Sequence, residues 1–332
     1  MATIHDVAKA AGVSAMTVSN VLNDRPHVRA ETREKVLRAI AELDYRVNPA
    51  ARRLRSSRTG TIGLAVPDIA QPYFGVLASH VVEAAGRRGL RVTVEQTSAA
   101  RDRELEAVAL SRRLMIDGLI LSALGVSVDD LRAIDYPLVL VGEKDLADEL
   151  PQVSMPNEEG ARAAVAHLLA TGSRRIAVLG GIVEDGGMAS ERLAGYRRAH
   201  GDAGLVPDPA LAVPAERYGI EGGATAAAEL LRRGAPFDGV FCMTDAVALG
   251  ALHALIGAGL RVPEDVQLVG FDDVPAARYA NPAISTVSPD HEFIAETAVV
   301  LLERRIAGEQ LPAPRRTVSP FSLALRGTTR RA

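Results

Sequence analysis

Apolar residues in the first 45 positions of the chain recur every three or four residues, which predicts three short helices. Thr3 precedes the first helix as a capping residue with Asp6 in the first turn, and Ser14 precedes the second. Gly12 lies between these two helices, where a glycine permits a tight turn. Three such helices with a glycine turn between the first two predict a helix-turn-helix. The apolar positions are Ile4, Val7, Ala8 and Ala11 in the first helix, Val18, Val21 and Leu22 in the second, and Val36, Leu37, Ile40 and Leu43 in the third.

From Thr61 onward the pattern changes to short apolar runs that alternate with amphipathic stretches. Such alternation predicts parallel sheets with helices on both faces. Because the rhythm starts again at position 175, the sequence predicts two doubly wound lobes, with ligands bound at the carboxyl ends of the strands. The cleft between the lobes is therefore the expected binding site. The predicted strands are 61–66, 90–94, 118–121, 137–141, 175–179, 239–243 and 266–270, and the helices predicted between the first of them are 73–88, 101–114 and 128–134.

These patterns divide the chain into a head, a hinge and a core. The predicted fold class is an all-α helix-turn-helix head plus an α/β core of two doubly wound parallel-sheet lobes. The expected ranges are 1–47 for the helix-turn-helix head, 48–60 for a hinge helix and linker, 61–332 for the core, 61–156 with 288–318 for lobe 1, and 157–287 with 319–332 for lobe 2.

Charge is divided unevenly along the chain. The formal net charge is −3, but positions 1–60 hold 11 Lys and Arg against 6 Asp and Glu, while the remainder holds 27 against 35. A basic head on an acidic core favours contact between the head and a polyanion such as DNA. Charge alone leaves ordinary surface charge open as the alternative.

Cysteine usage and the start of the chain favour a cytoplasmic protein. The single cysteine, Cys242, excludes an intrachain disulfide and fits a reducing compartment. The first six residues lack the basic segment and apolar stretch typical of a secretory signal. The longest apolar region, 239–260, is interrupted by Thr244, Asp245 and His253, so it predicts a buried strand followed by a helix rather than a membrane span.

The second predicted helix is the expected reader of DNA bases. If its apolar residues face inward, Ala15, Met16, Ser19 and Asn20 point outward, and a helix N-terminus fits the major groove. Asn20 could bond adenine through two hydrogen bonds, and Ala15 and Met16 could contact thymine methyl groups. A helical hairpin with a solvated outer face is the alternative. Phosphate contacts are expected from Ser14, Thr17, Arg33 and Lys35, so the candidate DNA-binding residues of the head are Thr3, Ser14, Ala15, Met16, Thr17, Ser19, Asn20 and Arg33.

Residues 48–55 combine Pro49, which can start a helix, with an Ala, Arg and Leu composition that favours one. About two turns without a wide apolar face are not stable alone, so this segment can fold only against a partner. A basic linker that never orders is the alternative.

Five stretches of the chain carry a pattern of greater specificity: Thr3-Ile4-x-Asp6-Val7-Ala8-x-x-Ala11-Gly12-Val13-Ser14-x-x-Thr17-Val18-Ser19-x-Val21-Leu22-Asn23 in the head, and 68–74, 192–196, 262–273 and 326–328 in the core. Together they resemble the LacI (lactose repressor)/GalR-type family of bacterial transcription regulators. The resemblance implies a type I periplasmic-binding-protein-like core and a homodimer on a palindromic operator in double-stranded DNA. Two departures affect details: many members have Arg where this chain has Asn20, and Pro where it has Val47.

The resemblance also implies that the hinge segment folds against a second hinge helix and the DNA minor groove. Paired hinge helices of the family lie in the minor groove, which implies that Leu54 is a wedge between two base pairs. Arg52 and Arg55, together with Arg53, would then neutralise phosphates.

By position, the resemblance implies a ligand site in the cleft. Arg192 and Asp272, both expected at strand ends, would make charge-assisted hydrogen bonds, while aromatic faces stack on a polyol or a heterocycle. Phe74 as a plain core residue is the alternative for that position. Glu143, after the fourth predicted strand, is an added candidate. The implied ligand-binding residues are Tyr73, Phe74, Glu143, Arg192, Tyr218, Asp245 and Asp272.

Two further departures bear on the ligand. Sugar-binding members commonly have Asp-Asn where this chain has Pro156-Asn157, and Asn-Asp where it has Thr244-Asp245. The donor and acceptor pattern therefore changes, and a typical hexose is not implied.

The sequence shows no constellation typical of an enzyme. Cys242 lies in an apolar run and is interpreted as a core residue. No His and Cys pair has metal-ligand spacing, and the glycine pairs 180–181 and 186–187 lack the Lys-Ser/Thr of a phosphate loop, so they predict a flexible cleft loop. The adjacent carboxylates Asp272 and Asp273 do not converge on one substrate. We expect no catalysis, cofactor or metal.

The predicted function is a sequence-specific transcription regulator, interpreted as a repressor, whose operator affinity is switched by a small sugar-like effector between the lobes. The end of the chain after Thr328 holds no leucine heptads, which favours a dimer over a tetramer. Two alternatives are a solute-binding receptor, which shares the lobes but would lack the head, and a sugar-modifying enzyme on the same fold.

Overall fold

The computed structural model describes residues 2–22, 28–43, 45, 58–142, 150–180, 187–215, 217–311 and 316–331. The chain divides into two compact units, Met1–Thr59 and Gly60–Ala332, each of which is described by itself. The predicted hinge helix lies outside the described residues.

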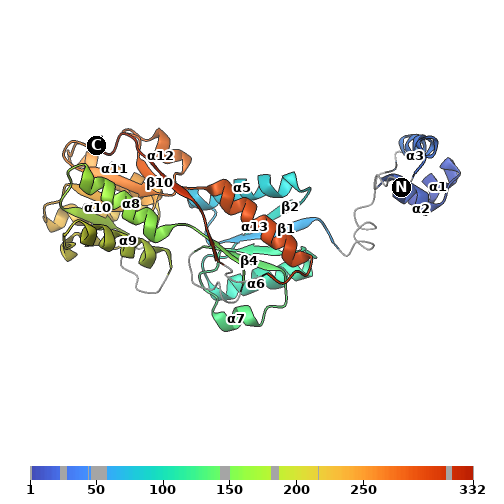
Figure 1. Cartoon of the computed structure of the whole chain (residues 1–332), viewed down its shortest axis with the longest axis horizontal. Coiled ribbons are helices and arrows are strands. Elements are labelled where there is room, and N and C mark those ends of the chain that lie inside the picture. The colour runs from blue at the N-terminus through green and yellow to red at the C-terminus, as the bar shows by residue number, and fades with distance from the viewer. Residues whose placement is uncertain are drawn as a thin grey trace. The chain divides into compact units, whose positions relative to one another are not determined.

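Three capped helices form the head. The Thr3 N–H donates to Asp6 Oδ2 at 2.8 Å and the Asp6 N–H donates to Thr3 Oγ1 at 3.3 Å, which closes a capping box. Gly12 takes a left-handed φ of 65° at the end of the first helix, and Ser14 Oγ accepts from the Thr17 N–H at the start of the second. The predicted helices and caps are therefore confirmed. The helices are α1 (Ile4–Ala11), α2 (Ala15–Leu22) and α3 (Ala30–Glu42) (Figure 1).

A small core of valines holds the head together. Val7, Val18 and Val36, one from each helix, are fully buried. The prediction that Leu37 and Leu43 share this buried side is wrong, because 50% of Leu37 and 37% of Leu43 is exposed. Leu37 lies outside the stripe that begins at Val36, and Leu43 follows the last residue of α3.

A six-stranded parallel sheet in the order β11-β5-β4-β3-β1-β2 forms lobe 1. Alternate residues of β1 face opposite layers: Leu64 packs with α5 and α13, and Ala65 packs with α6. The strands are β1 (Thr61–Val66), β2 (Arg91–Gln96), β3 (Leu119–Leu121), β4 (Leu138–Val141), β5 (Gln152–Ser154) and β11 (Arg316–Val318). The helices are α5 (Pro72–Arg87), α6 (Arg101–Arg113), α7 (Val128–Arg132) and α13 (His291–Ile306).

A second six-stranded sheet, in the order β12-β10-β9-β8-β6-β7, forms lobe 2. Its pairs are parallel except β10 with β12, which the sequence did not predict. The strands are β6 (Ile176–Leu179), β7 (Ala212–Val213), β8 (Gly239–Cys242), β9 (Gln267–Phe271), β10 (Ser285–Pro289) and β12 (Phe321–Ala324). The helices are α8 (Asn157–Ala170), α9 (Met188–Asp202), the short 3-10 turn η1 (Pro209–Leu211), α10 (Ile220–Arg233), α11 (Asp245–Gly257) and α12 (Pro275–Tyr279).

The apolar region 239–260 is a strand followed by a helix, as predicted. Cys242 lies fully buried in β8, where burial raises the pKa of its thiol. Among the described residues, no helix has the length and apolar character needed to span a membrane.

The chain passes between the two sheets after β5, after β10 and between β11 and β12 (Figure 1). At these crossings one apolar cluster contains residues of both lobes, among them Val153 in β5 and Met155 just after it, and Met243 and Phe271 at the ends of β8 and β9. The carboxyl ends of the lobe 2 strands therefore lie beside the crossings.

Glycine allows α10 and α11 to approach closely. A Cβ atom on Gly250 would lie 1.9 Å from the carbonyl oxygen of Ile220, and one on Gly223 would lie 2.2 Å from that of Val247. The helices could not keep this separation with a larger residue at either position.

We predict that Gly250→Ala forces the two helices apart and lowers the free energy of unfolding by about 1–3 kcal/mol, measured by urea denaturation. Gly257→Ala in the same helix is the control, because no atom lies within 4 Å of the place its methyl group would take and alanine favours a helix. An unchanged urea midpoint for Gly250→Ala would contradict the prediction.

Candidate functional site

The outer face of α2 presents fewer residues than the sequence predicts. Met16 is 61% exposed and Asn20 is half-buried, but Ser19 is only 6% exposed and Ala15 packs against the apolar core of the head. The prediction that Ala15 and Ser19 point outward is wrong. Ser19 is a helical neighbour of Ala15 and Leu22, and both of these pack inward.

The remaining candidates of the head lie near helix starts. Thr3 and Ser14 cap α1 and α2, and Thr17 Oγ1 lies 2.9 Å from Ser14 Oγ. Arg33 is half-buried on α3. Arg52, Leu54, Arg55 and Glu143 lie outside the described residues, as does the glycine-rich segment 181–186.

Arg192 lies at the centre of the candidate ligand site. The prediction of a strand end is wrong for this residue, which lies on α9 and is 1% exposed. Its Nε donates to Asn157 Oδ1 at 2.7 Å, its Nη1 to the carbonyl of Met243, and its Nη2 to Asp272 Oδ1 at 3.3 Å. The guanidinium also lies 3.5 Å from the ring centroid of Phe271, a cation–π contact.

Asp272 follows β9 directly, as predicted for a strand end, and is 3% exposed. Its backbone takes a φ of 113°, a region that few residues other than glycine adopt. His291 Nε2 lies 2.6 Å from the Asp272 carbonyl, so the ring nitrogen is the donor. The Asp272 backbone is thereby held at the crossing between β10 and α13.

Asp245 supports the loop after β9. It is completely buried, and its Oδ2 accepts from the Val274 N–H at 2.9 Å. Its Oδ1 faces Gly270, where a Cβ would lie 2.2 Å away. Burial, and next the negative charge of Asp272, raise the pKa of Asp245 well above its usual range.

The three aromatic candidates come from the start of α5 and from the residues before α10. Tyr73 and Phe74 lie in the first turn of α5 with ring centroids 5.0 Å apart, and Tyr73 packs against clusters of both lobes. Tyr218 precedes α10, is half-buried, and has a pKa that burial raises. Phe74 packs against the apolar cluster shared by both lobes, which agrees with the core alternative noted for this position.

Three polar residues of the network were not predicted. Asn157 begins α8 and links Arg192 to Glu191, and Glu191 pairs with Arg316 of β11 at 2.7 Å. The Pro156-Asn157 departure from the family pattern was the signal available in the sequence. Glu191 and Arg316 are far apart in the chain, and no motif singles them out.

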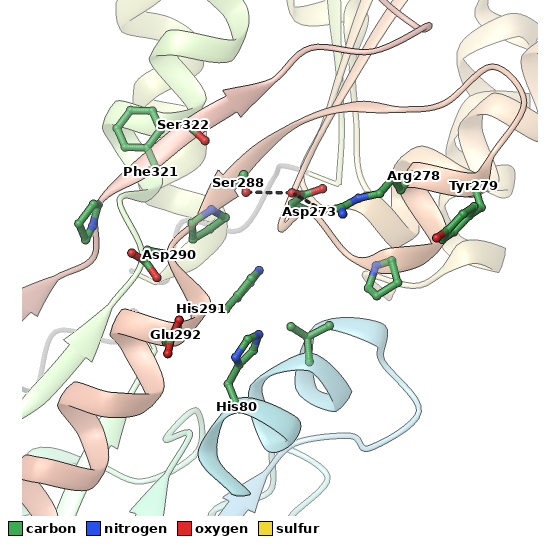
Figure 2. Close-up of a pocket in the computed structure, with 14 residues that line it drawn as sticks. His80, Asp273, Arg278, Tyr279, Ser288, Asp290, His291, Glu292, Phe321 and Ser322 are labelled. Atoms are coloured by element: carbon green, nitrogen blue, oxygen red, sulfur yellow. Dashed lines mark hydrogen bonds and ion pairs between the residues drawn. The ribbon is translucent and has the colours of Figure 1, made fainter. Parts of the chain in front are cut away.

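An open cavity of about 680 Å³ lies beside this network. Figure 2 shows it between α5, α12 and the start of α13, with His80 and His291 stacked at a centroid distance of 6.0 Å. Asp273 lines it, and the guanidinium of Arg326 and the Ser288 hydroxyl lower the pKa of that carboxyl although burial alone would raise it. None of the six described ligand-binding candidates lines this cavity. We regard Arg192 and its partners Asn157, Asp272 and the Met243 carbonyl, here called the Arg192 group, as the site because these polar groups converge on one guanidinium.

Comparison with known proteins places these two units in one family. The family described as "Bacterial regulatory proteins, lacI family" matches residues 3–48, and the "Periplasmic binding protein-like domain" matches residues 165–329. The ribose operon repressor of Halalkalibacterium halodurans is 32% identical over 332 residues, which cover 99% of this chain and 98% of that repressor. The chain belongs to the LacI family.

Solved structures of the LacI family match along the whole chain. A Lac repressor dimer bound to operator and the anti-inducer ONPF is 29% identical with a TM-score of 0.85, covering 99% of each chain. The transcriptional regulator CelR in a cellobiose complex is 32% identical with a TM-score of 0.74, covering 99% of this chain and 100% of that one. These matches confirm the predicted family, fold class and function as a DNA-binding transcription regulator.

We predict that acid weakens the core through the half-buried His291. Burial lowers the pKa of His291, so below about pH 6.5 the unfolded chain binds more protons than the folded chain. The free energy of unfolding therefore decreases as the pH is lowered. The groups that face its ring are His80, Tyr73, Asp273 and Asp290, and those carboxylates oppose the shift. The measurement is urea denaturation at about pH 7.5 and about pH 5.

His291→Gln, which keeps an N–H donor for the Asp272 carbonyl, should reduce the difference between the two pH values. His253→Gln is the control, because His253 is exposed on α11. An unchanged pH dependence in His291→Gln would show that other groups cause it.

Proposed function

We propose that the protein is an operator-binding repressor whose DNA affinity is switched by a small polyhydroxylated effector at Arg192 and Asp272. The observation that supports it most is the buried Arg192–Asp272 pair at the crossings of a chain that matches LacI-family regulators over its whole length. The pair offers a donor and an acceptor to hydroxyl groups at the place where the lobes meet.

The head supplies the DNA contacts in this proposal. Met16 and Asn20, on the outer face of α2, read base edges, and Ser14, Thr17 and Arg33 contact phosphates. Leu54 is the minor-groove wedge, flanked by Arg52 and Arg55. The Lac repressor structure contains a dimer on its operator, which supports a homodimer of this chain on a palindromic site.

The effector class follows from the relatives and from the site. CelR was solved with cellobiose and other relatives are ribose operon repressors, which supports a carbohydrate or a similar metabolite. Tyr73, Phe74 and Tyr218 would stack on its apolar face, while Arg192 and Asp272 bond its hydroxyls and Asp245 holds the Asp272 loop. Glu143 would add a carboxylate from lobe 1. We propose that the effector is bound without being turned over.

The switch is a population shift between lobe arrangements. Only an effector with different affinity for the two arrangements can change the operator affinity. An effector that favours the arrangement in which the hinges cannot pair acts as an inducer. An effector that favours the arrangement in which they can pair acts as a corepressor.

Selection of random duplex DNA by the purified protein, followed by titration of the selected duplex with cellobiose, ribose and a wider metabolite panel, tests the proposal. We expect a palindromic sequence whose binding one compound weakens or strengthens. No sequence preference at moderate salt would overturn the DNA-reading role, and chemical conversion of the active compound would show catalysis.

We predict that Asn20→Ala weakens binding to the selected duplex by about 1–3 kcal/mol and relaxes the preference at one base pair in each half-site. The measurement is fluorescence anisotropy with single-base variants of the duplex. Arg33→Gln is the contrast, because a phosphate contact should weaken all sequences equally and lower the salt slope by about one. A uniform loss for Asn20→Ala would instead make Asn20 a phosphate contact.

A further inference from the structure

An ion pair joins the two lobes beside the Arg192 group. Arg316, on β11 of lobe 1, donates from Nη2 to Glu191 Oε1, on α9 of lobe 2, at 2.7 Å. Its Nε also donates to Ser154 Oγ at 3.0 Å at the end of β5, so the guanidinium is held to the lobe 1 sheet. The two charged side chains are 27% and 26% exposed, which leaves the pair partly shielded from water.

Asn157 connects this ion pair to Arg192. Its Nδ2 donates to Glu191 Oε2 at 3.1 Å, and its Oδ1 accepts from Arg192 Nε at 2.7 Å. The amide can take only this orientation, because the reverse would place its NH2 against a guanidinium and its oxygen against a carboxylate. Asn157 is 1% exposed, so water does not replace either partner. The amide therefore relays the position of one charged group to the other.

Arg192 has its remaining contacts on the side of the site. In lobe 2 they are Asp272, the Met243 carbonyl and the ring of Phe271. Arg192 Nη2 also lies 3.3 Å from Sδ of Met155, which directly follows β5 of lobe 1. The lobe 1 sheet therefore reaches this guanidinium by two routes: directly through Met155, and through the polar chain of Arg316, Glu191 and Asn157. Glu191 and Arg192 are also consecutive on α9, so a shift of this helix moves both.

We propose that Glu191 and Arg316 are positioning residues, whose ion pair holds the lobes in the described arrangement and, through Asn157, holds the Arg192 guanidinium at Asp272. This rests on the proposed function in that Arg192 and Asp272 bind the effector. A ligand oxygen that draws Arg192 away weakens its bond to Asn157, and the amide then holds Glu191 less firmly toward Arg316. Occupancy of the site is in this way transmitted to lobe 1.

Two readouts in the full-length chain test the relay. Spin labels on Arg103→Cys in α6 and Arg232→Cys in α10 report the distance between the lobes by pulsed EPR, with labelled protein diluted into unlabelled protein. The native Cys242 is buried and does not take up the label. Hydrogen exchange of the Arg192 Nε proton, followed by ¹⁵N NMR and assigned with Arg192→Lys, reports the bond to Asn157.

Arg316→Gln should broaden or shift the distance between the labels and speed exchange of the Arg192 proton about fivefold, the effect of losing one partly exposed ion pair. Glu191→Ala should do the same or more, and the double variant should add little to Glu191→Ala because both act on one pair. Arg162→Gln is the matched control, because Arg162 and Asp202 form a 2.7 Å ion pair within lobe 2, between α8 and α9. It should change neither readout.

If the distance between the spin labels changes but exchange of the Arg192 Nε proton does not, the ion pair only holds the lobes together, and the relay is overturned. No change in either readout would overturn the whole proposal, with urea denaturation confirming that each variant is folded. Neither readout uses DNA or an effector. If selection yields no operator while Arg316→Gln changes both readouts, the relay holds and the proposed function fails.

Discussion

A guanidinium cannot be buried in a protein without hydrogen-bond partners and a compensating charge, because the loss of hydration costs several kcal/mol. Arg192 is the largest of the fully buried side chains, and its partners come from the start of α8 and the ends of β8 and β9. A parallel sheet brings such strand ends to one edge. The architecture of lobe 2 thus supplies, at one edge, the partners that the buried guanidinium requires.

The charge balance around Arg192 also accounts for the two buried aspartates. Asp272 pairs with the guanidinium, and Asp245 lies close enough for the charge of Asp272 to raise its pKa. One cation therefore pairs with one carboxylate, while burial and the charge of Asp272 raise the pKa of the other. Its hydrogen bond from the Val274 N–H holds the loop that follows β9.

The parts of the molecule that the sequence predicts are those marked by local signals, such as apolar runs, periodicity and helix caps. Strands such as β1 and β8 are apolar runs buried on both faces, and Asp272 was located because it ends such a run. The polar strand β10 (Ser285–Pro289) is defined by its backbone pairing, which leaves no apolar run.

The residues of the site that the sequence did not predict are those brought together by long-range contacts. Arg192 was misplaced because it lies in the second turn of α9 (Met188–Asp202), well past the end of β6 at Leu179. Glu191 and Arg316 are 125 positions apart, and only the folded topology brings them together. In the head, Ser19 is only 6% exposed, and the apolar periodicity of a helix does not predict the burial of a small polar residue.

The interleaving of the two sheets has a consequence for how the protein is made. Lobe 1 takes its edge strand from Arg316–Val318, and lobe 2 takes strands from Ser285–Pro289 and Phe321–Ala324. Neither sheet can be completed while these segments are still inside the ribosome, although the head has its own core and emerges first. During translation the two sheets therefore remain incomplete, with apolar strand edges unpaired, until the last segment of the chain has emerged.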